Sequence, residues 1–173
     1  MYNILITGTS ELSSAIQKKL DEHNVTLISK ETGNNINNVS EWGMEYADYD
    51  ILINLAYDSW GQIDLLQYFY YAWKNDPNKK IINIGSKVSS YGRSEITLEN
   101  HFWEYRLHKQ CLESAFLKMV ESALCDIKLI NPGPIDTAMV KHLDIPKMSK
   151  EFFSTQVKEI IFNPTVKRVD LWK

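Results

Sequence analysis

A tyrosine and a lysine four residues apart, Tyr105 and Lys109, are the first residues here whose types and spacing suggest proton-transfer chemistry. Residues at this spacing share one face of a helix, and a nearby ammonium favours the phenolate, so we expect Lys109 to lower the pKa of Tyr105. Ser86 follows a short apolar run and could hold a carbonyl or alcohol oxygen while Tyr105 transfers the proton. Tyr70 and Lys74 repeat the spacing, but they precede the strand that carries Ser86, whereas Tyr105 follows it.

Short apolar runs alternate with amphipathic stretches along the whole chain, and this pattern predicts the elements that must position these side chains. The expected strands cover residues 4–6, 25–28, 51–55, 81–84, 127–130 and 166–172, with a short one around Ile36, and the expected helices cover 12–20, 63–73, 99–121 and 153–161. This order predicts an α/β fold: a three-layer, Rossmann-like, doubly wound parallel sheet of about seven strands with helices on both faces. The length fits a single domain, 1–173, whose ligands would bind at the carboxyl ends of the strands.

The first expected strand ends in the segment TGTSELSS, residues 7–14, where a dinucleotide could bind. A tight turn followed by a helix N-terminus can hold a pyrophosphate, and Gly8, Ser10 and Leu12 are the residues placed to contact it. Glu11 is awkward here, because a carboxylate near a phosphate is repulsive unless it points away. A single Thr-Gly after a strand is more often only a turn, so this motif is weak on its own.

The second expected strand ends at Ser29 and Lys30. A site for NAD usually places an acid at this position to bind the ribose hydroxyls, whereas a 2′-phosphate prefers a cation and hydroxyl groups. Serine plus lysine therefore favours NADP(H) over NAD(H). A solvated lysine in a loop would explain Lys30 equally well.

Composition and charge narrow the function classes. Hydrophobic residues make up 44% of the 173 residues and charged residues 24%, values typical of a globular protein. The formal net charge of -3 argues against general binding to nucleic acid or to a membrane surface. No stretch reaches the roughly 18–20 apolar residues of a membrane span, and the N-terminus MYNILITG lacks the basic start of a signal peptide. We therefore expect a cytoplasmic protein, with Cys111 and Cys125 as reduced thiols.

Taken in order, these segments resemble the short-chain dehydrogenase/reductase family over essentially the whole chain. The matching segments are Thr7-Gly8, NLA at 54–56, Ser86, the Tyr105-x-x-x-Lys109 pair, and NPGPIDTAM at 131–139, which is the most specific. NINNV at 35–39 is similar to another family segment, with Asn35 in place of its usual aspartate. The chain resembles a minimal, divergent member of the family with a depleted glycine motif.

The resemblance implies an NAD(P)(H)-dependent oxidoreductase that transfers hydride between nicotinamide and a small alcohol or carbonyl substrate. It assigns Tyr105 as general acid/base, Ser86 as the residue that holds the substrate oxygen, and Lys109 as the residue that binds the nicotinamide ribose. The other implied cofactor-binding residues are Asn35 at the adenine, Asn54 and Ala56, and Pro132, Gly133, Ile135 and Thr137 along the nicotinamide. The family's fourth catalytic residue has no clear match, and Asp58 and Gln62 are both candidates.

Departures from the family pattern keep a second function open. The later glycines of the first motif are replaced by Glu11, Leu12 and Ser14. Tyr57 replaces the glycine expected after Ala56 and could crowd the adenosine-side approach of the cofactor. The alternative is therefore a catalytically inactive nucleotide-binding or scaffold protein that keeps the fold.

A nucleotide-sugar epimerase-like enzyme is a further alternative. SSYG at 89–92 and Glu113 resemble that branch of the family, although the chain has little room for the substrate domain of such an enzyme. The same segment contains Ser89 and Ser90, either of which could be the catalytic hydroxyl. We prefer Ser86 because it directly follows the strand.

The expected partners are a small-molecule substrate and a second copy of the chain, with a monomer as the alternative. Aromatic residues gather in the helices around 62–74 and 99–121, and such residues are enriched at interfaces, so these helices would form the homodimer. Residues 138–149 should form a short flap over the substrate. His108 and Cys111 stand three apart, but no third ligand is near in sequence, so we expect no bound metal.

Overall fold

A parallel sheet with a single reversal of strand order forms the centre of the protein. The computed structural model describes residues 1–90 and 100–172, and the side chains within 1–90 and 102–172. The six strands are β1 (Asn3–Thr7), β2 (Asn24–Ile28), β3 (Ile51–Asn54), β4 (Lys80–Ile84), β5 (Asp126–Pro132) and β6 (Arg168–Leu171). All neighbours are parallel, in the order β2-β1-β3-β4-β5-β6. Because the order reverses at β1, a ligand crevice is expected at the carboxyl ends of β1 and β3.

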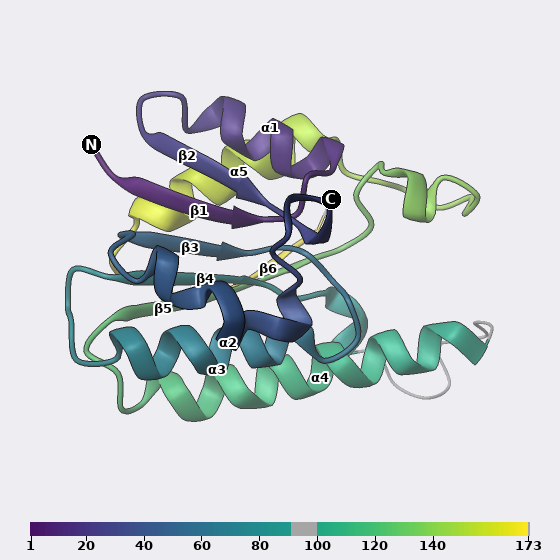
Figure 1. Cartoon of the computed structure of the whole chain (residues 1–173). Coiled ribbons are helices and arrows are strands. Elements are labelled where there is room, and N and C mark those ends of the chain that lie inside the picture. Colours follow the sequence, from purple (N-terminus) through teal and green to yellow (C-terminus); the bar gives the residue numbers. More distant parts are fainter. Residues whose placement is uncertain (91–99, 173) are drawn as a thin grey trace.

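Helices cover both faces of the sheet. The helices are α1 (Glu11–Lys19), α2 (Val39–Trp42), α3 (Gly61–Trp73), α4 (Asn100–Val120) and α5 (Lys150–Phe162). Figure 1 shows α1 and α5 together on one face, and α2, α3 and α4 on the other. The prediction of a three-layer, Rossmann-like, doubly wound sheet is therefore confirmed.

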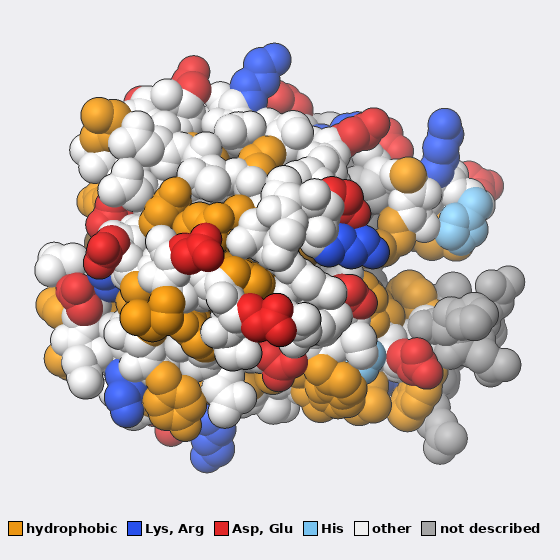
Figure 2. Space-filling model, in the orientation of Figure 1, with side chains coloured by type: hydrophobic (Ala, Val, Ile, Leu, Met, Phe, Trp, Pro, Cys, Tyr) orange, Lys and Arg blue, Asp and Glu red, His pale blue; other side chains and the backbone are white. Residues whose placement is uncertain are grey.

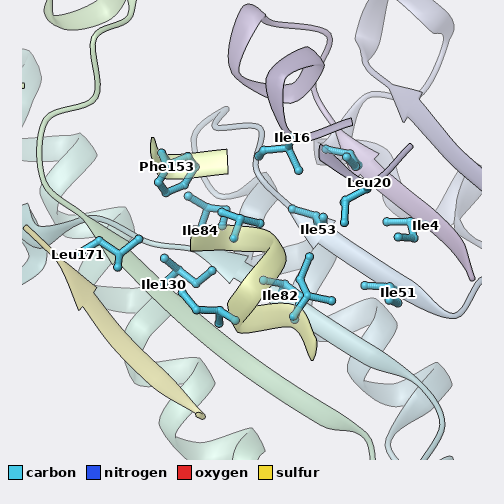
Figure 3. Close-up of a cluster of buried hydrophobic side chains, with 14 of the residues drawn as sticks. Ile4, Ile16, Leu20, Ile51, Ile53, Ile82, Ile84, Ile130, Phe153 and Leu171 are labelled. Carbon is cyan, nitrogen blue, oxygen red and sulfur yellow. The ribbon is translucent and has the colours of Figure 1, made fainter. Parts of the chain in front are cut away.

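Alternation of side chains along each strand divides the core into two layers. Ile4 and Ile6 of β1 pack toward α1 and α5, whereas Leu5 packs toward α2, α3 and α4. Figure 3 shows the first layer, where isoleucines from four strands meet Ile16 of α1 and Phe153 of α5. Burying one such side chain contributes roughly 1.5–3 kcal/mol, so the pattern strongly favours one register for each strand.

The short strand expected around Ile36 is wrong, because these residues form a 3-10 helix, η2 (Ile36–Asn38). The side-chain oxygen of Asn35 accepts a hydrogen bond from the backbone N–H of Asn37 at 3.0 Å, which turns the chain instead of extending it. Ile36 is still buried, but it packs against α3. The described residues therefore form six strands instead of about seven.

A buried lysine lies near the amino ends of the strands. Lys128 of β5 is 0% exposed, and its ammonium donates hydrogen bonds to the carbonyl oxygens of Asn163 and, at 2.9 Å, Val166. The Asp126 carboxylate lies 3.2 Å from the same nitrogen. Burial lowers the pKa of Lys128, and Asp126 opposes this shift. The lysine thus binds the carbonyl group at the C-cap of α5 and one in the loop that follows it, with a carboxylate beside it.

Other features bear on the function classes raised by the sequence. Within residues 1–90 and 100–172, no helix has both the length and the apolar character needed to cross a membrane. The described His, Cys, Asp and Glu side chains include no group of three or more that could hold a metal ion. Cys111 and Cys125 are free thiols, and burial raises the pKa of Cys125 to about 11. On the face drawn in Figure 2, Lys and Arg side chains stand apart from one another.

Candidate active site

The three residues predicted to do chemistry meet at the carboxyl end of β4. Ser86 lies two residues beyond β4, and its side chain is near enough to Tyr105 to act on the pKa of the phenol. Helix α4 carries Tyr105 and Lys109 one turn apart, and the Lys109 ammonium lies 5.4 Å from the centroid of the Tyr105 ring. A hydroxyl, a phenol and an ammonium are therefore brought together at one edge of the sheet.

The pKa of Tyr105 differs from the expectation drawn from the sequence. Burial raises the pKa of this phenol, Tyr57 adds to the rise, and the hydrogen bond with Ser86 acts in the opposite direction. The expected lowering by Lys109 is wrong for this structure, because helical spacing identifies a neighbour but says nothing about desolvation of the phenol. A phenol with a raised pKa keeps its proton at neutral pH and can donate it.

Lys109 is almost fully buried, and its hydrogen-bond acceptors among the described residues are neutral. Its side chain is 4% exposed, and its ammonium donates hydrogen bonds to Gln62 Oε1 at 2.6 Å and to the Ile84 carbonyl oxygen at 2.8 Å. Burial lowers the pKa of Lys109 to about 7. The ammonium is therefore held close to losing its proton at neutral pH.

Gln62 is the candidate fourth residue that contacts Lys109. Its amide donates hydrogen bonds to the carbonyl oxygens of Asn54 at 2.9 Å and Ile84 at 3.0 Å, which leaves its oxygen for the lysine. The Asn54 amide donates in turn to the Gln62 carbonyl oxygen at 2.7 Å. Asp58 contributes its carbonyl oxygen to the turn before α3. Asn54, expected at the cofactor, is thus buried in the network that supports Lys109.

The turn after β1 is tied to the end of β3. Gly8 has a φ of +102°, a left-handed conformation that favours glycine, and its N–H donates to the Ile28 carbonyl oxygen at 2.6 Å. The Thr7 hydroxyl accepts hydrogen bonds from the N–H groups of Leu55 at 3.0 Å and Ala56 at 3.1 Å. A Cβ placed on Gly8 would lie 3.6 Å from that of Ala56. The predicted cofactor residues Gly8 and Ala56 therefore lie together at the strand switch.

Helix α1 begins directly after this turn. Ser10 is its N-cap, and the Ser10 hydroxyl accepts a hydrogen bond from the N–H of Ser13 at 3.3 Å. Glu11 forms an ion pair with Lys150 of α5, which lowers the pKa of the Glu11 carboxyl group. Leu12 packs its side chain against the core. Lys150 therefore neutralises the acid that the sequence places awkwardly for a phosphate.

The residues after β2 include both a cation, which suits the 2′-phosphate of NADP, and an acid, which suits the ribose hydroxyls of NAD. Ser29 is buried and Lys30 is exposed. Glu31 follows, and hydrogen bonding with Ser29 lowers the pKa of its carboxyl group. Glu31 was not among the predicted site residues, although an acid near this strand end could bind ribose hydroxyls. Asn35, expected at the adenine, uses its side-chain oxygen to cap η2.

The segment after β5 approaches β6 closely. Pro132 is the last residue of β5, and the N–H of Gly133 donates a hydrogen bond to the Leu171 carbonyl oxygen at 2.8 Å. A Cβ on Gly133 would lie 2.6 Å from the ring of Trp172, so any other residue here would require that ring to shift. The two residues therefore have a structural role in addition to the predicted contact with nicotinamide.

The expected flap is anchored at both ends. Ile135 and Met148 are buried and form an isolated β-bridge. Thr137 precedes a 3-10 helix, η6 (Ala138–Val140), and most residues from there to 147 are exposed. Figure 1 shows this segment extending beyond the carboxyl edge of the sheet, on the same side as the N-terminal end of α4.

The rival hydroxyl groups have other partners. Ser89 donates a hydrogen bond to Glu113 Oε2 at 2.7 Å, and Ser90 donates to the Lys87 carbonyl oxygen at 2.8 Å. Of the three, Ser86 is the one whose side chain acts on the pKa of the phenol on α4. The geometry therefore favours Ser86 as the hydroxyl of the site.

Aromatic side chains that were not among the predicted site residues surround Tyr105. The Tyr57 ring meets the Tyr105 ring edge-on, with centroids 4.8 Å apart, and the Tyr57 hydroxyl is hydrogen-bonded to His108 Nδ1 at 2.9 Å. Trp60 meets the His108 ring edge-on, with centroids 4.4 Å apart. Two signals were present in the sequence: Tyr57 occupies a glycine position of the resembled family, and His108 directly precedes the lysine.

The turn after β1 and the start of α1 fit the pyrophosphate of a nicotinamide dinucleotide. Near Tyr105, the ring of Tyr57 would have to move to admit the nicotinamide end. The turn at Gly8 and the N-terminus of α1 offer N–H groups to a pyrophosphate, and Glu11 is already paired. Lys109 can donate hydrogen bonds to ribose hydroxyls. The ring of Tyr57, however, lies against Tyr105 where the nicotinamide end would come.

Comparison with known proteins bears on the fold. No family model matches the sequence, and no curated protein matches it. A short-chain dehydrogenase from Burkholderia cenocepacia J2315, in complex with NADP, aligns with a TM-score of 0.76 at 17% identity, covering 99% of this chain and 88% of that chain. Serine dehydrogenase from Escherichia coli aligns with a TM-score of 0.73 at 14% identity, and the alignment covers 98% of this chain and 96% of that chain. An alcohol dehydrogenase from the archaeon Thermococcus sibiricus, complexed with 5-hydroxy-NADP, gives 0.74 at 16% identity, covering 99% and 96%.

At these identities the likeness establishes the architecture of the chain. The alignments span nearly all of this chain, from β1 to β6, in agreement with the order of motifs in the sequence. The protein therefore has the fold of the short-chain dehydrogenases and reductases, at 14–17% sequence identity to the three compared structures.

Proposed function

We propose that this protein is an NAD(P)(H)-dependent oxidoreductase of the short-chain dehydrogenase/reductase type, acting on a small alcohol or carbonyl substrate. The observation that carries the proposal is the meeting of Ser86, Tyr105 and Lys109 beside the strand switch. Solved structures of the same fold that contain NADP or NADP+ support a nicotinamide cofactor.

Each of the three residues has its own role. The bound cofactor supplies or accepts the hydride at the substrate carbon. Tyr105 donates a proton to the carbonyl oxygen in reduction and takes it back in oxidation, while Ser86 holds that oxygen with a hydrogen bond. Lys109 binds the ribose hydroxyls, and its positive charge stabilises the phenolate left after proton transfer. Gln62 is the positioning residue that fixes the ammonium.

The proposed cofactor preference is NADP(H). Lys30 is exposed at the end of β2, where its cation could pair with a 2′-phosphate, and Ser29 lies beside it. Glu31 is the opposing feature, since its carboxylate would repel the same phosphate. Titration with NADPH and NADH tests this preference, and tighter binding of NADH would overturn it.

Replacement of Tyr105 by Phe tests the proposed function. The variant should lose turnover and keep cofactor binding, because only the proton donor is removed. Tyr70→Phe is the matched control, since Tyr70 belongs to the second tyrosine–lysine pair. Its hydroxyl is hydrogen-bonded to Ser122 at the exposed surface. Wild-type turnover in the Tyr105 variant would overturn its role as acid/base.

An inactive nucleotide-binding protein is the second candidate. It is favoured by the Tyr57 ring that lies on Tyr105, and by the loss of the later glycines after Gly8. Binding of NADPH without turnover of any alcohol or carbonyl in a broad panel would select this candidate over the enzyme.

A homodimer through α3 and α4 is also proposed. These helices pack side by side, and Tyr71, Trp103 and Leu117 are exposed by 61%, 58% and 47% of their surfaces. Large apolar side chains of this kind are enriched at interfaces. Light scattering of the purified protein would give the mass directly, and a monomer at micromolar concentration would overturn the dimer.

A further inference from the structure

Tyr57 lies in the most crowded position of the site. It follows Ala56, whose backbone is fixed by Thr7, and its side chain reaches α4. Its ring is edge-on to the Tyr105 ring at 4.8 Å between centroids, which is within direct contact for two aromatic rings. No ligand ring or ribose fits between two side chains at this separation.

The same ring covers the free side of the Lys109 ammonium. Two of the three N–H groups of that ammonium donate to Gln62 and to the Ile84 carbonyl oxygen. The third has the rings of Tyr57 and Tyr105 as neighbours, with centroids 5.6 Å and 5.4 Å from the nitrogen, within the range of cation–π attraction. On this side of the ammonium, a ribose hydroxyl can approach only if one ring leaves.

Contacts on its far side hold Tyr57 in this position. Its hydroxyl is hydrogen-bonded to His108 Nδ1 at 2.9 Å, and His108 is itself buried beneath Trp60. Tyr105 has less freedom to move, because it belongs to α4, whereas Tyr57 lies in the loop between β3 and α3. Ser59 in that loop has a φ of +48°, a conformation that non-glycine residues rarely adopt. Of the two rings, that of Tyr57 is therefore the one that can leave without moving a helix.

We infer that Tyr57 controls access of the nicotinamide ribose to Lys109 and Tyr105. In the closed position its ring takes the place of the ribose, and cofactor binding breaks its hydrogen bond with His108 and moves the ring out. Tyr57 is thus a residue that sets cofactor affinity. This inference rests on the proposed function, because the cofactor is the ligand that Tyr57 excludes.

Fluorescence titration of NADPH into wild type, Tyr57→Ala and Tyr57→Phe tests the inference. The alanine variant should bind about tenfold more tightly, equivalent to about 1.4 kcal/mol, because binding no longer breaks the ring contacts and the His108 bond. The phenylalanine variant loses only the hydrogen bond with His108, so its affinity for NADPH should lie between those of wild type and Tyr57→Ala. Tyr2→Ala is the matched control, since Tyr2 packs on His23 at the opposite edge of the sheet and should keep wild-type affinity.

Equal or weaker binding in Tyr57→Ala would overturn the control of access while leaving the proposed cofactor in place. No binding of NADPH to either protein would overturn both. A second measurement uses unmodified protein: saturation with NADPH should shift the NMR signal of the His108 ring, and the His23 signal should stay. An unmoved His108 signal at saturation would also overturn the inference.

Discussion

Lys109 and Lys128 are both buried in this protein, near opposite edges of one sheet, and their surroundings differ in one respect. Lys128 has the Asp126 carboxylate 3.2 Å from its ammonium, together with the carbonyl groups at the end of α5. Lys109 has a carbonyl oxygen and the amide of Gln62, and its partners carry no negative charge. Burial of an ammonium is costly. Among the described residues, a charge that offsets this cost lies beside Lys128 and none lies beside Lys109.

The difference distinguishes a structural lysine from a functional one. Lys128 joins β5 to the C-terminal end of α5, and a carboxylate beside it keeps that contact intact. The pKa of Lys109 is lowered to about 7 by burial alone, and a strongly shifted pKa in a crevice marks a candidate functional site. Its uncompensated charge is available to a ligand or to a developing phenolate on Tyr105.

The largest expected difference between the two lysines is in catalysis. Lys109→Met should reduce turnover by about a thousandfold, because it removes the cation that stabilises the Tyr105 phenolate. Lys128→Met should leave the turnover of the folded protein unchanged, since Lys128 lies away from the site. Steady-state kinetics with a substrate found by screening checks both. Equal losses in the two variants would remove the distinction.

The second difference is in the pH dependence of stability. Between about pH 7 and pH 9 the unfolded chain keeps the proton of Lys109 that the folded protein releases, so acid favours the unfolded state. The free energy of unfolding should therefore rise with pH, by up to about 1.4 kcal/mol per unit. Chemical denaturation at several pH values measures the slope. The slope should be smaller in Lys109→Met, and an unchanged slope would contradict the buried, shifted ammonium.

Removing the carboxylate tests the other half of the comparison. Asp126→Asn should lower the free energy of unfolding by about 3 kcal/mol, because it leaves Lys128 buried without its counter-charge. Asp170→Asn is the control: Asp170 pairs with Lys87 at 2.7 Å, but both side chains are partly exposed, so the loss should stay below about 1 kcal/mol. Similar losses in the two variants would mean that Asp126 does not compensate Lys128.

Gln62→Glu should make Lys109 resemble Lys128, at the cost of the two hydrogen bonds that the Gln62 amide donates to Asn54 and Ile84. A carboxylate at this position would raise the pKa of the ammonium back toward its ordinary value. The variant should therefore lose the pH slope of wild type while remaining folded, as shown by denaturation curves at pH 7 and pH 9. A wild-type slope in this variant would show that Gln62 does not set the environment of Lys109.

The architecture was predictable because its signals are local and repeated. The runs 51–54 and 81–84 are continuous and apolar, as expected of strands buried on both faces, and they formed β3 and β4. Around Ile36, a single apolar residue among asparagines gave a weak strand signal. The side chain of Asn35 caps a 3-10 helix there instead.

The meeting of the candidate residues was predictable from the sequence, and their energetics were not. Ser86 and Tyr105 come together as their order along the chain indicates. The raised pKa of Tyr105 depends on how much water its phenol loses, and the position of Tyr57 depends on a rotamer chosen by packing on α4. Neither quantity can be read from residue spacing.

The most direct test of the account is a fluorescence titration of NADPH and NADH into wild type and Lys109→Met. The account predicts saturable binding to wild type, tighter for NADPH, and at least tenfold weaker binding to the variant because the ribose loses its cation. Absence of binding to wild type at roughly millimolar cofactor, or equal affinity in the two proteins, would contradict it.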